Sequence, residues 1–269
     1  MYYKFNSEFI IRLLTGIIYI LLIFFAIEQG DKLFRILMMI FSYICFFELL
    51  IIFKIYIKLI QSSLYILICP ILIDLIISKK LYIIFFIIYY IYIMFQLFCL
   101  KCSYKEKINQ IIHVLFGLFY IIIPFYLSTI IYSNFDHGKD IILNTFLMIW
   151  TNDTCSFIIG KQLGKNIISI SISPKKTVEG VFGGMLFCFI LSLYIQIWWL
   201  DIEWIFLSIV ISIFATIGDF IESIIKRSYN VKHSGILFPG HGGFLDRFDS
   251  YIIVIPIITI IFFIKHLII

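Results

Sequence analysis

Long apolar runs recur along the whole chain, and they constrain its fold more than any other feature. Runs of about 20 residues are each long enough to cross a hydrocarbon core of roughly 30 Å as a helix. Only 14% of the residues are charged, against roughly 25% in soluble globular chains. The runs are continuously apolar and do not alternate with polar residues, which disfavours a membrane β-barrel. The sequence therefore predicts an all-α, polytopic integral membrane protein.

Nine candidate spans can be placed along the chain, and the positive charges orient them. The spans cover 9–27, 33–53, 59–78, 81–100, 110–132, 141–160, 181–200, 204–225 and 250–268. With the N-terminus in the cytoplasm, most of the 21 lysines and arginines fall on the cytoplasmic side, as the positive-inside rule requires. No small-residue cleavage site follows the first run, so we expect it to be retained as a span. The net charge of +5 follows from this topology and does not indicate a nucleic-acid partner.

The two parts of the chain differ in character. Residues 1–140 contain apolar spans joined by short polar turns, so we expect N-terminal transmembrane helices there. Residues 141–269 hold most of the glycines and two long cytoplasmic loops, 161–180 and 226–249, so we expect a catalytic transmembrane region there. Glu48 and Asp74 also lie within apolar spans, but no polar neighbours in the sequence indicate a role for them.

The segment GDFIESIIKR carries polar side chains at helical spacing. By this spacing, four of them lie on one helix face: Asp219, Glu222, Ser223 and Lys226. Asp219 lies inside an expected span, where a charge costs roughly 2.5–3.5 kcal/mol on insertion scales, so it should face protein, water or a metal. The alternative is a helix end with snorkelling charges, which accounts for Lys226 and Arg227 but not for Asp219.

The segment FPGHGGFLDRFDS, residues 238–250, interrupts helical structure just before the last apolar run. Its glycines and proline forbid a regular helix, and backbone N–H groups of such a loop at a helix start can bind an anion. Asp246 and Asp249 share a face if that turn is helical. Carboxylates beside an anion site indicate a bridging divalent cation, and oxygen ligands favour Mg²⁺ over zinc. His241 is equally compatible with a binding role and with an ordinary loop histidine.

Two further polar segments lie at cytoplasmic ends of spans. In SPKKTVEGVFGG, residues 173–184, Thr177 can cap the next helix and the glycines allow close helix packing. Lys175 and Lys176 either hold phosphates or mark the cytoplasmic side. The residues Asn-Asp-Thr at 152–154 are polar within an expected span. Carboxylates, lysines and a glycine loop are together the parts of a metal-assisted phosphate chemistry, whereas a transporter places polar groups near the membrane midplane.

These segments closely resemble the signature of the phosphatidate cytidylyltransferase family, also called CDP-diacylglycerol synthases. The matching positions are Ser223, Lys226, Arg227, Lys232, Pro239, His241, Gly242, Gly243, Asp246, Arg247 and Asp249, with an upstream block at Asp153, Thr154, Gly160, Gly164, Lys165, residues 173–177, Glu179 and Gly180. The motifs cover about residues 150–250. The chain departs from the family pattern at His233, where the family has aspartate, and at Val178, where tryptophan is common.

The resemblance implies transfer of a cytidylyl group from CTP to phosphatidic acid, giving CDP-diacylglycerol and pyrophosphate. It also implies a need for Mg²⁺, with K⁺ as a candidate companion cation. The bias toward isoleucine and lysine and the lack of an evident transit peptide favour a bacterial cytoplasmic membrane. A homodimer is a candidate assembly.

The residue patterns and the resemblance together suggest a role for each polar group. We expect Asp219, Asp246, Lys226 and Arg247 to be catalytic. We expect substrate contacts from Lys175, Lys176, Thr177, Arg227, Lys232, His241, Gly242, Gly243 and Ser223. We expect metal ligands among Asp219, Asp246, Asp249 and Asp153. In this hypothesis Lys226 and Arg227 attract the phosphatidate headgroup, whose phosphate oxygen attacks the α-phosphorus of CTP in line, and catalysis comes mainly from positioning and charge neutralisation.

Two other functions are compatible with parts of the sequence. A CTP-dependent membrane lipid kinase shares the nucleotide and the setting, but it would release CDP, and the full PxHGGxxDRxD run disfavours it. A non-catalytic transporter or scaffold is favoured only by His233.

Overall fold

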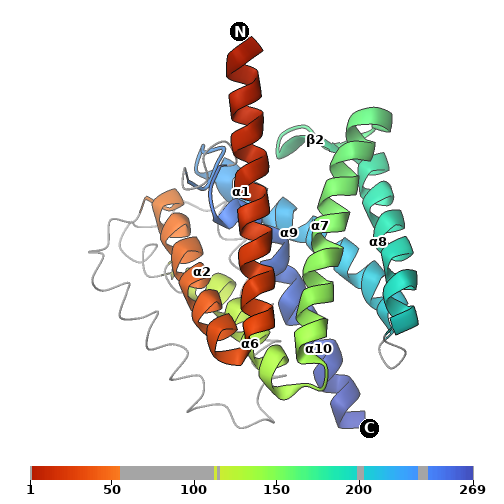
Figure 1. Ribbon diagram of the computed structural model, residues 1–269. Coiled ribbons are helices and arrows are strands. Elements are labelled where there is room, and N and C mark those ends of the chain that lie inside the picture. Colours follow the sequence, from red (N-terminus) through yellow and green to blue (C-terminus); the bar gives the residue numbers. More distant parts are fainter. Residues whose placement is uncertain (1, 55–111, 114–115, 199–202, 236–241, 269) are drawn as a thin grey trace.

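The fold is built almost entirely from long helices (Figure 1). The computed structural model describes residues 2–54, 112–113, 116–198, 203–235 and 242–268. The helices are α1 (Tyr2–Gln29), α2 (Asp31–Ile52), the π-helix η1 (Leu118–Ile122), α6 (Ile123–Asn134), α7 (Gly138–Leu163), α8 (Val178–Trp198), α9 (Trp204–Ser228), the 3-10 turn η2 (Leu245–Arg247) and α10 (Asp249–Ile268). The expected spans 9–27, 33–53, 141–160, 204–225 and 250–268 coincide with helix, and so do the described parts of 110–132 and 181–200. The spans 59–78 and 81–100 lie outside the described residues.

The outer surface of the helices is that of a membrane protein. Within the described ranges, Asp31–Ile52, Val178–Ile197 and Trp204–Ser228 are long and apolar enough to cross a bilayer. On α8, the side chains of Phe182 and Ile197 are 65% and 70% exposed, which suits contact with lipid far better than contact with water. Helices fit this setting because they satisfy their backbone hydrogen bonds internally. The predicted all-α, polytopic fold is confirmed, whereas the number of nine spans and the cytoplasmic N-terminus stay predictions.

Helices α7 and α8 lie side by side (Figure 1), and glycines allow their close approach. A Cβ added at Gly184 would lie 2.7 Å from the carbonyl oxygen of Asn152. A Cβ added at Gly180 would lie 2.7 Å from the carbonyl oxygen of Ser156. These neighbours are backbone atoms and cannot rotate away. The close helix packing predicted from the glycines is therefore present, and it brings the polar part of α7 against the start of α8.

A short hairpin occupies part of the loop that was expected at 161–180. Helix α7 continues to Leu163, and β1 (Ile167–Ser169) then pairs antiparallel with β2 (Ser173–Thr177). The hairpin was not predicted; the alternation of isoleucine and serine in this segment has the period of a strand and could have indicated it. The hairpin lies at the end of the molecule where α7 finishes and α8 begins (Figure 1).

Two side chains fix the connection from the hairpin to α8. Thr177 Oγ1 accepts a hydrogen bond from the Gly180 N–H at 3.2 Å, so it caps α8 as predicted. Glu179 accepts hydrogen bonds from the backbone N–H groups of Lys165 and Asn166 at 3.1 and 3.2 Å. These contacts hold both ends of the hairpin near α8, and they set the position of the lysines on β2.

An aromatic cluster supports the segment between η2 and α10. Phe248 is fully buried, and its ring centre lies 5.2 Å from that of Phe41, 5.1 Å from that of Phe125 and 5.6 Å from that of Tyr19. These rings come from α2, α6 and α1 respectively. Phe248 lies between Arg247 and Asp249 in the chain. Its burial among three helices therefore fixes the position of the backbone that carries these two polar residues.

We predict that Gly184→Ala destabilises the protein by about 1–3 kcal/mol, because the added methyl group overpacks the contact with the Asn152 backbone. Thermal unfolding in detergent micelles measures the change. Gly16→Ala is the matched control, since no atom lies within 4 Å of a Cβ added there, and its melting temperature should not fall. Equal melting temperatures for Gly184→Ala and the parent protein would contradict the proposed packing.

Candidate active site

Two pockets meet at Asp153 on α7. The first, which we call the acidic pocket, is lined by α1, α7 and the segment leading into α10, and it includes Asp153, Asp246, Arg247 and Asp249. The second, which we call the lysine pocket, is lined by α7, β2, α8 and α9, and it includes Asp153, Lys175, Lys176, Thr177 and Asp219. Each pocket has a volume of about 210 Å³. Asp153 therefore belongs to the walls of both.

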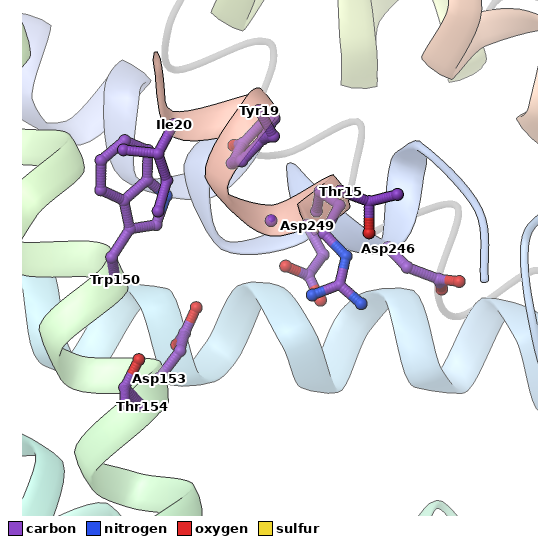
Figure 2. A pocket seen from close by; sticks show the side chains of 10 residues that line it. Thr15, Tyr19, Ile20, Trp150, Asp153, Thr154, Asp246 and Asp249 are labelled. Carbon is purple, nitrogen blue, oxygen red and sulfur yellow. The ribbon is translucent and has the colours of Figure 1, made fainter. Parts of the chain in front are cut away.

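The acidic pocket has a polar side and an apolar side. Figure 2 shows Asp153 projecting from α7 toward the space in front of Asp249, while Tyr19 and Ile20 of α1 stand on another side of that space. Trp150 completes the apolar side, with its ring centre 5.9 Å from that of Tyr19. Ile20 is 42% exposed. The pocket therefore places carboxylates next to a helix whose outer surface is apolar.

A close crossing of α9 and α10 brings carboxylates together. A Cβ added at Gly218 would lie 2.6 Å from the carbonyl oxygen of Asp249, so a larger residue would force the two helices apart. This crossing sets Asp219, the next residue along α9, near Asp249, and the charges of Asp219 and Asp153 both act on Asp249. In the part of the chain that the structure describes, no three acidic, histidine or cysteine side chains form a ready-made metal site.

Lys176 supplies a positive charge to this group of acids. Its Nζ lies 2.5 Å from Asp219 Oδ2 and 4.5 Å from the centre of the Phe220 ring. Ser223, one turn further along α9, donates a hydrogen bond to Asp219 Oδ1 at 3.3 Å. Lys175 is exposed and also lines the lysine pocket. The lysine pocket thus presents two ammonium groups from β2 beside two acidic side chains, Asp153 and Asp219.

Lys226 lies deeper and holds two carboxylates together. Its Nζ is 2.5 Å from Glu222 Oε2 and 2.5 Å from Asp246 Oδ1. Only 11% of the Lys226 side chain and 1% of the Glu222 side chain are exposed. The expected role of Lys226 at the lipid headgroup does not fit this position, because its ammonium is enclosed between acids. The helical face predicted for Glu222 and Lys226 is present, but it points into the protein.

Asp246 is held on both of its oxygens. Oδ1 accepts a hydrogen bond from Lys226 Nζ. Oδ2 accepts hydrogen bonds from the backbone N–H groups of Gly243 at 2.9 Å and Ser234 at 3.3 Å. Burial opposes ionisation of Asp246, but the ion pair with Lys226 outweighs it and lowers the pKa of the carboxyl group. Asp246 is therefore charged at neutral pH. His233 Nδ1 lies 3.8 Å from Asp246 Oδ2, so the departure from the family pattern falls beside this carboxylate.

Among the other predicted site residues that the structure describes, Arg227, Lys232, Gly242 and Gly243 do not line either of these two pockets. Arg227 is exposed, and it donates hydrogen bonds to the carbonyl oxygens of Ile172 and Val231 at 3.4 Å, which joins the hairpin to the end of α9. Lys232 and Arg247 are exposed. Gly242 has a φ of 92°, in the region that favours glycine, and Gly243 is buried below it. His241 lies outside the described residues.

Several residues at the site were not found by sequence reasoning. Glu48 of α2 is 1% exposed and accepts hydrogen bonds from the loop that carries Asp246. Asp74, the other acid that lacked polar sequence neighbours, lies outside the described residues. Tyr19 and Trp150 line the acidic pocket, and nothing in the sequence distinguished them from the many aromatic residues of the spans.

Comparison with known proteins identifies the family. A model described as the cytidylyltransferase family matches residues 10–265. The chain belongs to the cytidylyltransferase family. Curated relatives named phosphatidate cytidylyltransferase come from Staphylococcus epidermidis, 42% identical over 135 residues, from Staphylococcus aureus (strain COL), 41% identical, and from Staphylococcus haemolyticus, 40% identical. The first two alignments cover 48% of this chain and 52% of the relative, so the chain spans about half the length of the curated relatives it matches. The family resemblance drawn from the motifs is confirmed.

We predict that Lys226→Met lowers the free energy of unfolding by about 3–5 kcal/mol, because it leaves two buried carboxylates without their cation. Chemical unfolding in detergent, followed by circular dichroism, measures the loss. Lys232→Met is the matched control: it removes an exposed lysine, and its effect should stay within about 0.5 kcal/mol. If the two variants lose the same stability, the buried ion pair does not support the site.

Proposed function

We propose that this protein transfers a cytidylyl group from CTP to phosphatidic acid, releasing CDP-diacylglycerol and pyrophosphate. Family membership and the names of the relatives support a cytidylyltransferase. The observation that carries the choice of substrates is the position of Asp153, in the wall shared by a lysine-rich pocket and a pocket bordered by the apolar helix α1. The lysine pocket suits a soluble polyanion, and the acidic pocket suits a phosphate that carries apolar chains.

The lysine pocket is the proposed site of the triphosphate. Lys175 and Lys176 project from β2, a segment held to α8 by Thr177 and Glu179, so their charges are placed without a long flexible tether. Two ammonium groups offset the charge of a triphosphate better than one, and they favour nucleotide over neutral ligands. We assign Lys176 to this role even though it pairs with Asp219, because an incoming phosphate can replace that carboxylate as its partner.

The acidic pocket is the proposed site of the phosphatidate headgroup. Tyr19 and Ile20 give it an apolar side on α1, against which the first carbons of the acyl chains can pack. Arg247 lines the same pocket, and its planar guanidinium matches a phosphate in geometry and charge. We therefore assign the headgroup to Arg247, and we assign Lys226 to holding Asp246 in place.

The described carboxylates fit a divalent cation by their chemistry. Asp153, Asp219 and Asp249 come from three different helices and repel one another electrostatically. Lys176 forms an ion pair with Asp219. Oxygen donors of this kind favour Mg²⁺, and we propose these three as its ligands, with K⁺ as a candidate companion. They do not form a ready-made site in the described residues, so they would have to move closer together to hold the ion. When bound, such a cation neutralises phosphate charge. Asp246 supports the site from outside, since both of its oxygens are already engaged.

The reaction needs alignment more than proton transfer. A phosphate oxygen of phosphatidate attacks the α-phosphorus of CTP, a new P–O bond forms, and the bond to the bridging oxygen of the β-phosphate breaks to release pyrophosphate. The attacking phosphate is already anionic, so no strong general base is required. The chain contributes by holding the triphosphate with Lys175 and Lys176 and the headgroup with Arg247, on either side of Asp153.

The setting follows from the same proposal. Phosphatidate is a membrane lipid, and the relatives are bacterial, so we place the protein in a bacterial cytoplasmic membrane. CTP and phosphatidic acid are its proposed small-molecule partners. The homodimer suggested from sequence stays a prediction.

We predict that purified protein in detergent, given phosphatidic acid, Mg²⁺ and CTP labelled on the α-phosphate, moves the label into the lipid phase. CTP labelled on the γ-phosphate should leave the lipid unlabelled, because that phosphate departs in pyrophosphate. Label transfer from the γ position alone would identify a lipid kinase instead. No transfer from either position, in protein whose circular dichroism shows intact helix, would indicate a non-catalytic role.

We predict that Asp219→Asn and Asp246→Asn each reduce kcat by about 100-fold or more, since each removes a charge on which the arrangement of the site depends. The same labelling assay measures the rate, and membrane extraction checks that insertion is unchanged. Asp140→Asn is the control: Asp140 lies in the first turn of α7, far along the helix from Asp153, and its variant should keep the parent rate. A near-normal rate in either of the first two variants would remove that residue from the site.

A further inference from the structure

Glu48 is a buried acid that accepts hydrogen bonds from a loop distant in the sequence. It lies near the end of α2, it is 1% exposed, and its two oxygens accept three hydrogen bonds. Oε1 accepts from the Phe244 N–H at 2.9 Å, and Oε2 accepts from the Leu245 N–H and the Ser234 hydroxyl, each at 2.8 Å. The partners are 186 to 197 residues away in the chain.

The loop is shaped around this carboxylate. A Cβ added at Gly243 would lie 2.5 Å from Glu48 Oε2, and one added at Gly235 would lie 2.8 Å from Glu48 Cδ. Both glycines therefore let the backbone approach the carboxylate more closely than any other residue would. Among the ion pairs of the described residues, none involves Glu48. The three hydrogen-bond donors of the loop therefore offset the cost of burying this carboxylate.

The same loop residues present the polar groups of the acidic pocket. Phe244 and Leu245 directly precede Asp246 and Arg247, and the Ser234 N–H donates to Asp246 Oδ2. The Phe244 ring also packs against Phe41 of α2, with ring centres 4.9 Å apart. Helix α2 therefore holds this loop by one apolar contact and by the hydrogen bonds of Glu48, and the hydrogen bonds determine the register of the backbone.

We propose that Glu48 is a positioning residue: it fixes the backbone of residues 243–245 so that Asp246 and Arg247 stand at the edge of the acidic pocket. Its effect on turnover rests on the proposed function, but its effect on the loop does not. Glutamine cannot replace it, because an amide offers one acceptor oxygen and turns N–H donors toward the donors of the loop. Aspartate is shorter by one methylene group and cannot reach all three partners.

Hydrogen–deuterium exchange of the full-length protein in detergent tests the effect on the loop. We expect Glu48→Gln to speed exchange in peptides covering residues 242–248 by at least about tenfold, because each hydrogen bond lost opens the segment locally. Peptides from α8 should be unchanged. Leu49→Ala is the matched control, since Leu49 is equally buried on α2 but makes no hydrogen bond to the loop through its side chain. Unchanged exchange in 242–248, or the same increase in Leu49→Ala, would overturn the proposal.

Turnover gives a second, independent readout. We expect Glu48→Gln to lower kcat by at least about tenfold while the KM for CTP stays close to that of the parent, because the lysine pocket is built from other elements. Combining Glu48→Gln with Ser234→Ala should cost less than the sum of the two single losses, since both remove the same hydrogen bond. A loss confined to the KM for CTP, or full additivity, would contradict the assignment.

The outcomes separate this inference from the proposed function. If the parent protein shows no label transfer while Glu48→Gln loosens residues 242–248, the proposed function fails and the positioning role stands. If label transfer is normal and the loop is unaffected, the positioning role fails alone. Should Glu48→Gln not fold, Ser234→Ala carries the same exchange test, since it removes a single donor and should loosen the same segment to a smaller extent.

Discussion

Lys226 holds one ammonium group between two carboxylates, and much of the polar end of the molecule depends on that contact. Glu222 lies on the same helix, while Asp246 belongs to the loop before α10. The three charges lie among apolar helices, where a single unpaired charge would be unfavourable by several kcal/mol. The ion pair therefore joins α9 to the loop, and that loop in turn leads into the helix that carries Asp249. Stability and the geometry of the pockets come from the same contact.

Much of this fold could be predicted because the signals are local. Apolar runs long enough to span a bilayer marked the helices, and the spacing of Asp219, Glu222 and Lys226 marked one helix face. Thr177 was recognisable as a cap because capping depends on residues three positions apart, and the glycines of α8 marked a close helix contact. In each case the signal is a spacing of residues within one element, even where the partner atoms, as for the α8 glycines, lie on another helix.

Other parts of the site could not be predicted because their partners are remote. Glu48 has no polar neighbour in sequence, and the donors that explain its burial lie at the other end of the chain. Spacing placed Lys226 on the correct face, but it could not tell whether that face meets lipid headgroups or a second carboxylate, since Asp246 comes from a different element. Tyr19 and Trp150 gave no signal either, because aromatic residues are common throughout the spans and their role depends on which helix they meet.

Asp153 lies in the wall between two pockets, and this position affects how the proposed substrates and products would enter and leave. The lysine pocket is lined by the lysines of the hairpin, and the acidic pocket borders α1. If nucleotide and lipid occupy them as proposed, a water-soluble product and a lipid-soluble product form on opposite sides of one residue. Each can then return to its own phase without crossing the other: pyrophosphate to water, the nucleotide-bearing lipid sideways into the bilayer. Under the proposed function, the wall at Asp153 would therefore separate the side of the site that opens to water from the side that opens to lipid.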